Sequence, residues 1–123
     1  MPILQLYTTL PAHRVPQDFP HKTTVVLSEV IANTPSKMIN VHVITDQNFY
    51  TGNNPDRSKH SGYAVLYAMA TGSPDDNRRI ITALYAHVKQ ELGIDERQFF
   101  VCINDVDPNL CGLKGKLLAD LLK

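Results

Sequence analysis

The chain has 123 residues, of which 43% are hydrophobic and 20% charged, and its 12 basic and 12 acidic residues cancel. This composition excludes a disordered chain, and the charge balance argues against nucleic acid or a membrane as a partner. Two cysteines are too few for a disulfide framework, and the five histidines show no metal-ligand spacing. We therefore expect one domain over residues 1–123, without metal or cofactor.

No leader or membrane segment is apparent in the sequence. No apolar run approaches the roughly 20 residues of a membrane span. The first residues lack the basic and apolar regions of a secretory signal. The expected compartment is the cytosol, with export without a signal peptide as the alternative.

The first half of the chain predicts a strand, a helix and a second strand. Alternating polarity favours a strand over residues 3–9, and a helix is expected from residues 18–19 onward. Pro20 falls in the first turn of this helix, where a missing N–H costs nothing. Asn33 is typical of the left-handed residue that ends a helix, and residues 38–45 form the second strand. The helix carries an apolar stripe of Thr23, Val26, Leu27, Val30 and Ile31.

The second half repeats this order after a polar loop over residues 51–62. Residues 63–70 are mostly apolar, which predicts a central strand buried on both faces. Ser73 is a good N-cap for a second helix, which Gly93 ends, and residues 99–103 form the last strand. The stripe of this helix is Ile81, Leu84, Tyr85, Val88 and Leu92.

Two β-α-β units of similar length predict an α+β fold. Right-handed crossovers place both helices on one face of a four-stranded mixed sheet. The other face would carry Ile, Leu, Val and Tyr side chains without a cover, which indicates self-association. Residues 114–123 are predicted to form an extra helix with four leucines on one side, Leu117, Leu118, Leu121 and Leu122.

Short motifs along nearly the whole chain resemble those of one family. They are MPIL at residues 1–4, LPAHRVP at 10–16, VHV at 41–43, DNR at 76–78 and LGI at 92–94. In order and spacing they resemble the macrophage migration inhibitory factor and D-dopachrome tautomerase family. The resemblance implies a duplicated β-α-β subunit, assembled as a homotrimer whose sheets line a central barrel.

Pro2 is the residue of these motifs that carries chemistry. If Met1 is removed, the nitrogen of Pro2 becomes a secondary amine at the chain terminus. An ordinary α-amino group has a pKa of about 8, and an apolar pocket lowers such a value because it disfavours the charged form. A neutral amine is a competent general base that can move a proton at the carbon beside a ketone. With Met1 attached, the same nitrogen is an amide and not a base.

The resemblance also places substrate-binding residues, several of which differ from the family pattern. Thr34 stands where relatives have a lysine that meets the substrate carboxylate, and Lys37 is a nearby cation. Thr71, at the end of the third strand, offers a hydroxyl. Phe100 and Cys102 stand at the family's tyrosine and asparagine positions. The expected set is Pro2 as the catalytic residue and Thr34, Lys37, Ala70, Thr71, Phe100 and Cys102 as substrate-binding residues.

Two functions follow from these residues. The first is a cofactor-independent isomerase, a tautomerase that acts through Pro2 on small aromatic keto acids of the phenylpyruvate or dopachrome type. The second is a cytokine-like binding protein whose catalytic pocket has decayed and whose surface recognises a receptor protein. The presence of Pro2 favours the first, and the departures from the family pattern favour the second.

Overall fold

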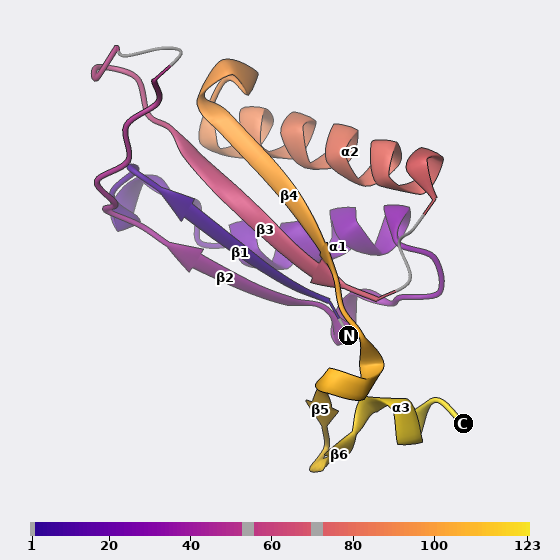
Figure 1. Cartoon of the computed structure of the whole chain (residues 1–123). Helices are drawn as coiled ribbons and strands as arrows, with labels where there is room; N and C mark the ends of the chain where they lie inside the picture. Colours follow the sequence, from indigo (N-terminus) through magenta and orange to yellow (C-terminus); the bar gives the residue numbers. More distant parts are fainter. Residues whose placement is uncertain (1, 53–55, 70–72) are drawn as a thin grey trace.

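A four-stranded sheet with two long helices forms the body of the chain in the computed structural model, which describes residues 2–52, 56–69 and 73–123 (Figure 1). In spatial order the strands are β2 (Asn40–Ile44), β1 (Ile3–Thr8), β3 (Gly62–Ala68) and β4 (Phe99–Asp105). Neighbouring strands β1 and β2 are parallel, β3 and β4 are parallel, and the central pair β1–β3 is antiparallel. The sequence predicts this pair of β-α-β units.

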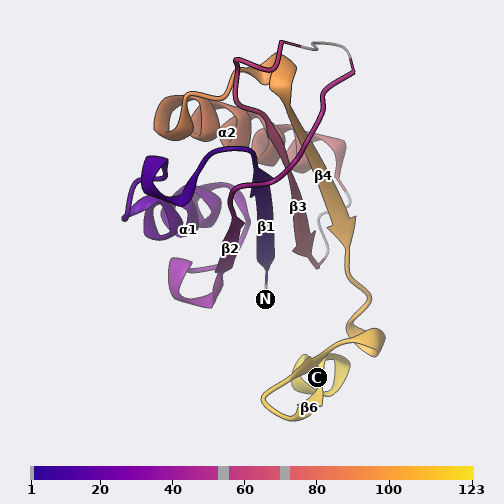
Figure 2. The ribbon, with the colours of Figure 1, turned by 90° about the vertical axis from the view of Figure 1, so that its left-hand side faces the viewer.

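Both long helices lie on the same face of the sheet, as Figures 1 and 2 show. Helix α1 spans Phe19–Val30 with Pro20 in its first turn, and α2 spans Pro74–Leu92. Ser73 caps α2, and Gly93 ends it with a φ of 68°. The start of α1 and both ends of α2 confirm the sequence prediction, whereas α1 ends at Val30, before the predicted Asn33, which adopts a φ of 57° in the turn that follows. The short 3₁₀ turns are η1 (Ala12–Arg14), η2 (Ser36–Met38), η3 (Glu96–Gln98) and η4 (Pro108–Leu110).

The core lies between the helices and the sheet. Leucines from both layers meet there with at most 1% of their surface exposed, namely Leu4, Leu6, Leu27, Leu66 and Leu84. Burying each such side chain contributes about 1.5–3 kcal/mol as an upper bound. The buried residues of α2 differ in part from the predicted stripe. Ile80 and His87 are buried with the leucines, whereas Ile81 and Tyr85 are only half-buried.

Gly62 allows strands β1 and β3 to approach closely at the start of β3. A Cβ atom at this position would lie 2.2 Å from the carbonyl oxygen of Tyr7. Because that oxygen belongs to the backbone of the central strand, it cannot move aside without distorting the sheet. Only glycine fits here.

The open face of the sheet mixes aromatic and polar side chains. Tyr7 stacks on Tyr63 with ring centroids 4.7 Å apart, and Phe100, in register with Tyr63, is 62% exposed. Gln5 and His42 form a polar row beside them. The predicted apolar face is therefore only partly apolar. The prediction that the third strand is buried on both faces is wrong for this chain, because the tyrosines of β3 are half-buried.

The C-terminal segment projects from the end of β4, away from the sheet (Figures 1 and 2). The prediction of a helix over residues 114–123 is wrong. Instead, β5 (Gly112–Leu113) and β6 (Lys116–Leu117) form a hairpin, and the single turn α3 (Leu118–Leu121) follows. Lys114 and Gly115 cause this change, because both adopt positive φ angles of 54° and 75°, as a two-residue hairpin turn requires. Of the four leucines, Leu118 is buried within the chain, and Leu117, Leu121 and Leu122 are exposed.

Candidate functional site

Pro2 lines a cavity at the end of the sheet where β1 begins. The residue is buried, and its carbonyl oxygen accepts a 3.0 Å hydrogen bond from the backbone N–H of Asn40, the first residue of β2. This bond fixes the start of the chain against the neighbouring strand. The cavity has a volume of about 400 Å³, within the range of sites that bind small molecules.

The topology brings four segments to this cavity. Strand β1 begins here, and β3 ends here because it runs antiparallel to β1. Helix α1 runs back along the sheet and ends here, and α2 begins here. The large apolar side chains of the described lining are Val30, Ile31, Met38, Met69, Ile80 and Leu122.

Thr34 and Asp76 supply polar groups to the cavity wall. The hydroxyl of Thr34 donates a 3.0 Å hydrogen bond to the carbonyl oxygen of Ala32, so its oxygen remains available as an acceptor. The carboxylate of Asp76 forms an ion pair with Arg79, one turn further along α2. Among the described lining residues, Asp76 has the only ionisable side chain. The cavity wall thus carries a carboxylate where a cation would suit an anionic substrate.

Sequence analysis does not identify Asp76 as a site residue, because a carboxylate in the first turn of a helix is explained by the helix dipole alone. Its place in the cavity follows from the antiparallel pairing of β1 with β3. That pairing brings the N-terminus of α2 to the same edge of the sheet as Pro2. The position of Asp76 beside Pro2 can be inferred only once the strand order is known.

The other predicted binding residues are not gathered around Pro2 in this chain. Lys37 is exposed in η2 and does not line the cavity. Ala70 and Thr71 lie outside the described residues, although Met69 before them lines the cavity.

Phe100 and Cys102 lie on the open face of β4 and are exposed. Phe100 is in register with Tyr63, which pairs with Tyr7 at the far end of β1. Within one chain, this aromatic ring is therefore at the opposite end of the sheet from Pro2. The predicted contact between Phe100 and the Pro2 cavity is therefore not made within one chain.

A buried histidine joins the two helices away from the cavity. His87 of α2 is 8% exposed and stacks on Phe19, and its Nε2 lies 2.9 Å from the hydroxyl oxygen of Thr23. That hydroxyl donates to the carbonyl oxygen of Phe19, so it accepts from Nε2–H. Burial lowers the pKa of His87 below its ordinary 6.5, while the charge of Glu91 opposes the shift. The neutral ring is therefore part of the packing between the helices.

Neither a membrane span nor a metal cluster is found in the described part of the chain. None of the described helices has the length and hydropathy to cross a membrane. The described residues also contain no group of three or more His, Cys, Asp or Glu side chains arranged to hold a metal ion.

The duplicated β-α-β subunit, with a proline at the start of β1 and a cavity beside it, defines an α+β protein of the tautomerase type. The chain belongs to the macrophage migration inhibitory factor (MIF) family, whose model matches residues 1–119. It is 26% identical over 115 residues to the macrophage migration inhibitory factor homolog of Trichinella spiralis, covering 94% of this chain and 97% of that protein. It is also 26% identical over 125 residues to the MIF-like protein mif-2 of Caenorhabditis elegans, covering 100% of this chain and 99% of that protein.

Solved structures show the same fold. The macrophage migration inhibitory factor of Trichinella spiralis aligns with a TM-score of 0.83 at 24% identity, over 93% of this chain and 97% of that one. The macrophage migration inhibitory factor of Oncomelania hupensis aligns with a TM-score of 0.84 at 15% identity, over 95% of this chain and 81% of that one. These comparisons confirm the predicted family and the predicted α+β fold. The chain is a tautomerase-like or cytokine-like protein of the MIF type.

Proposed function

We propose that this chain is a cofactor-independent keto–enol tautomerase in which Pro2, freed by removal of Met1, is the general base. The observation that carries this proposal is the position of Pro2, buried in the wall of a cavity of about 400 Å³. The lining around it is mainly apolar, and such surroundings favour the uncharged form of an amine. An uncharged amine beside a bound ketone is a proton acceptor.

The reaction needs only proton transfers. The lone pair of the Pro2 nitrogen takes a proton from the carbon next to the substrate carbonyl, and the electrons of that C–H bond form a C=C bond. The carbonyl oxygen takes a proton from solvent and becomes the enol hydroxyl, and the protonated Pro2 nitrogen releases its proton to solvent, which restores the base. In the reverse direction, the protonated nitrogen returns its proton to carbon. No electron leaves the substrate, so no redox partner is required.

The proposed substrates are small aromatic keto acids of the phenylpyruvate or dopachrome type. Met38, Met69 and Ile80 supply apolar surface for a ring. The hydroxyl oxygen of Thr34 accepts a hydrogen bond from a substrate hydroxyl. The carboxylate of Asp76 opposes an anionic substrate, so we expect neutral esters of these acids to be turned over better than the free acids.

We also propose a homotrimer. The aromatic row Tyr7, Tyr63 and Phe100 on the open face supports self-association, as does the projecting β5–β6 hairpin. In such an assembly, Phe100 of one copy can reach the Pro2 cavity of another. Light scattering should then give three times the 13.8 kDa chain mass, and a stable single chain at micromolar concentration would contradict this.

A receptor-binding, cytokine-like protein without turnover is the second candidate. The observation that favours it is the charge of the cavity, where the described lining offers Asp76 and no cationic side chain. Lys37, the predicted substitute for the family's lysine, is exposed outside the cavity. A pocket that repels the carboxylate of a keto-acid substrate is consistent with a catalytic site that has lost its activity.

One experiment separates the two candidates. Mass spectrometry of the purified protein establishes whether Met1 is present, and the same sample is assayed on phenylpyruvate-type and dopachrome-type substrates and on their methyl esters. The tautomerase proposal predicts a mass reduced by one methionine and saturable turnover of the esters. A protein with free Pro2 and no turnover of any of these substrates would contradict it and leave the binding protein.

A further inference from the structure

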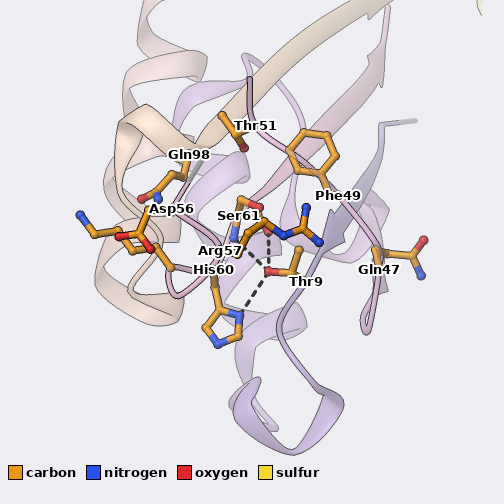
Figure 3. Close-up of a pocket in the computed structure, with 10 residues that line it drawn as sticks. Thr9, Gln47, Phe49, Thr51, Asp56, Arg57, His60, Ser61 and Gln98 are labelled. Carbon is orange, nitrogen blue, oxygen red and sulfur yellow. Dashed lines mark hydrogen bonds between the residues drawn. The ribbon is translucent and has the colours of Figure 1, made fainter. Parts of the chain in front are cut away.

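A second cavity, whose lining residues are drawn in Figure 3, lies at the end of the β1–β3 pair opposite Pro2. Its volume is about 230 Å³. Thr9, directly after β1, and Ser61, directly before β3, form its base. The backbone N–H of Ser61 donates to the hydroxyl oxygen of Thr9, and the N–H of Thr9 donates to the carbonyl oxygen of Ser61, each at 3.0 Å. These bonds anchor the base of the cavity in the sheet.

A buried hydroxyl and an amide line this cavity. The hydroxyl oxygen of Thr51 is buried in its wall and has no hydrogen-bond partner among the described residues. A buried hydroxyl without a partner is costly, so this group is set to meet a polar ligand. Gln98, the last residue of η3, lines the same wall and makes no side-chain hydrogen bond within residues 2–52, 56–69 and 73–123, the part that the structure describes. Its amide offers a ligand N–H donors and a carbonyl acceptor.

The charged groups of this cavity leave a surplus of positive charge. Arg57 and Lys59 line it, and neither forms an ion pair with a described carboxylate. The guanidinium of Arg57 donates to the side-chain oxygen of Asn48 at 3.2 Å and lies over the Tyr50 ring at 5.5 Å, so both of these partners are neutral groups.

Asp56 is the carboxylate of the described lining, and it is engaged locally. It accepts hydrogen bonds from the hydroxyl and the backbone N–H of Ser58, at 2.5 and 2.9 Å. These bonds lower the pKa of Asp56, so the group stays ionised and bound to Ser58. The negative charge of Asp56 offsets one of the two cations, which leaves one net positive charge among the described lining residues to attract an anion.

We propose that this cavity binds a small phosphate monoester. A phosphate offers several strong acceptor oxygens, which match the guanidinium fork of Arg57, the ammonium of Lys59 and the amide of Gln98. Phe49 supplies an apolar wall for a short organic stem. The volume of about 230 Å³ admits a group somewhat larger than inorganic phosphate. This site is independent of Pro2 and of the proposed tautomerase.

Isothermal titration calorimetry on the full chain tests the proposal with three probes: inorganic phosphate, phenyl phosphate and benzoate. We expect phenyl phosphate to bind more tightly than inorganic phosphate, because its ring adds contact with Phe49, and benzoate to bind most weakly. Saturation with inorganic phosphate at equal affinity would show that the ligand is free phosphate. Benzoate binding at least as tightly as phenyl phosphate, or no binding of either phosphate at millimolar concentration, would overturn the proposal.

Three variants locate the site. Arg57→Gln and Gln98→Met should each lower the affinity for phenyl phosphate about tenfold. The melting temperature of each variant should stay within a few degrees of wild type. Arg97→Gln is the matched control, because Arg97 is exposed next to Gln98 and does not line the cavity. An equal loss of phenyl phosphate affinity in Arg97→Gln would show that the ligand is attracted by positive charge in general, and would overturn the proposed site. Should Gln98→Met unfold, Arg57→Gln alone decides, because Arg57 is in the loop before β3 and its side chain is not part of the core.

Discussion

Pro2 and Thr34 line the same cavity, although one residue precedes β1 and the other follows α1. The chain reverses its direction through α1 and so returns to the end of the sheet where Pro2 lies. The hydrogen bond from the backbone N–H of Asn40 to the carbonyl oxygen of Pro2 holds Pro2 in place there. Position 34 is therefore well placed to set the charge next to the proposed base.

Replacing Thr34 by lysine should place a cation in the cavity. We expect kcat/KM for a phenylpyruvate-type free acid to rise roughly tenfold or more, because a hydrogen bond to a charged group contributes about 1.5–3 kcal/mol. The methyl ester should gain little. Ser36→Lys is the control, since Ser36 lies two residues further on and is absent from the lining. Equal gains for acid and ester, or equal gains in Ser36→Lys, would show that position 34 does not meet the substrate carboxylate.

Asp76→Asn should also favour anionic substrates, by removing negative charge from the cavity wall. The ratio of kcat/KM for free acid to that for ester should rise several-fold, because the repulsion of like charges is lost. Asp75→Asn is the matched control. Asp75 forms an ion pair with Arg78, as Asp76 does with Arg79, but Asp75 does not line the cavity. If both variants shift the ratio equally, the effect is one of overall charge and not of the site.

The buried His87 should make folding stability depend on pH. Burial lowers its pKa in the folded state, so below about pH 6.5 the unfolded chain binds more protons than the folded chain. The free energy of unfolding should thus be highest above that pH and fall as the pH drops toward the folded-state pKa. Urea unfolding between pH 8 and 5 measures this slope. His87→Gln should flatten it, whereas replacement of the exposed His21 by Gln should leave it unchanged.

Gly62→Ala should destabilise the sheet, because its methyl group would collide with the carbonyl oxygen of Tyr7. Forcing an extra carbon into a packed site costs about 1–3 kcal/mol, and more where backbone must move. Gly112→Ala is the control, since a Cβ there would meet its nearest atom at an ordinary 3.5 Å. Thermal unfolding should show a clear loss for the first variant and almost none for the second. Matching melting temperatures would contradict the contact.

Local signals in the sequence account for most of the fold. The N-cap Ser73 and the left-handed Gly93 delimit α2 because their effects depend only on neighbouring residues. The tail shows the limit of such reasoning. Its leucine spacing indicates a helix, but the left-handed Lys114 and Gly115 turn the chain into a hairpin. Residue spacing alone does not reveal that choice.

The candidate site could be predicted only in part. Pro2 and Thr34 are found in one cavity as the family resemblance implies, whereas Asp76 reaches it through the pairing of distant strands. Phe100 lies on the opposite end of the sheet within its own chain. Its relation to Pro2 depends on how copies assemble, which is a property of the oligomer and not of one folded chain.

The most direct test of the proposed mechanism is an alanine inserted between Met1 and Pro2. The insertion converts the Pro2 nitrogen into an amide and leaves every side chain of the cavity in the sequence. Turnover of a phenylpyruvate-type methyl ester is compared with that of wild-type protein whose mass shows a free Pro2, with circular dichroism and light scattering as checks of fold and assembly. The account predicts a loss of about 10²–10⁴-fold in rate with both checks unchanged. An inserted variant that keeps wild-type turnover would show that Pro2 is not the base.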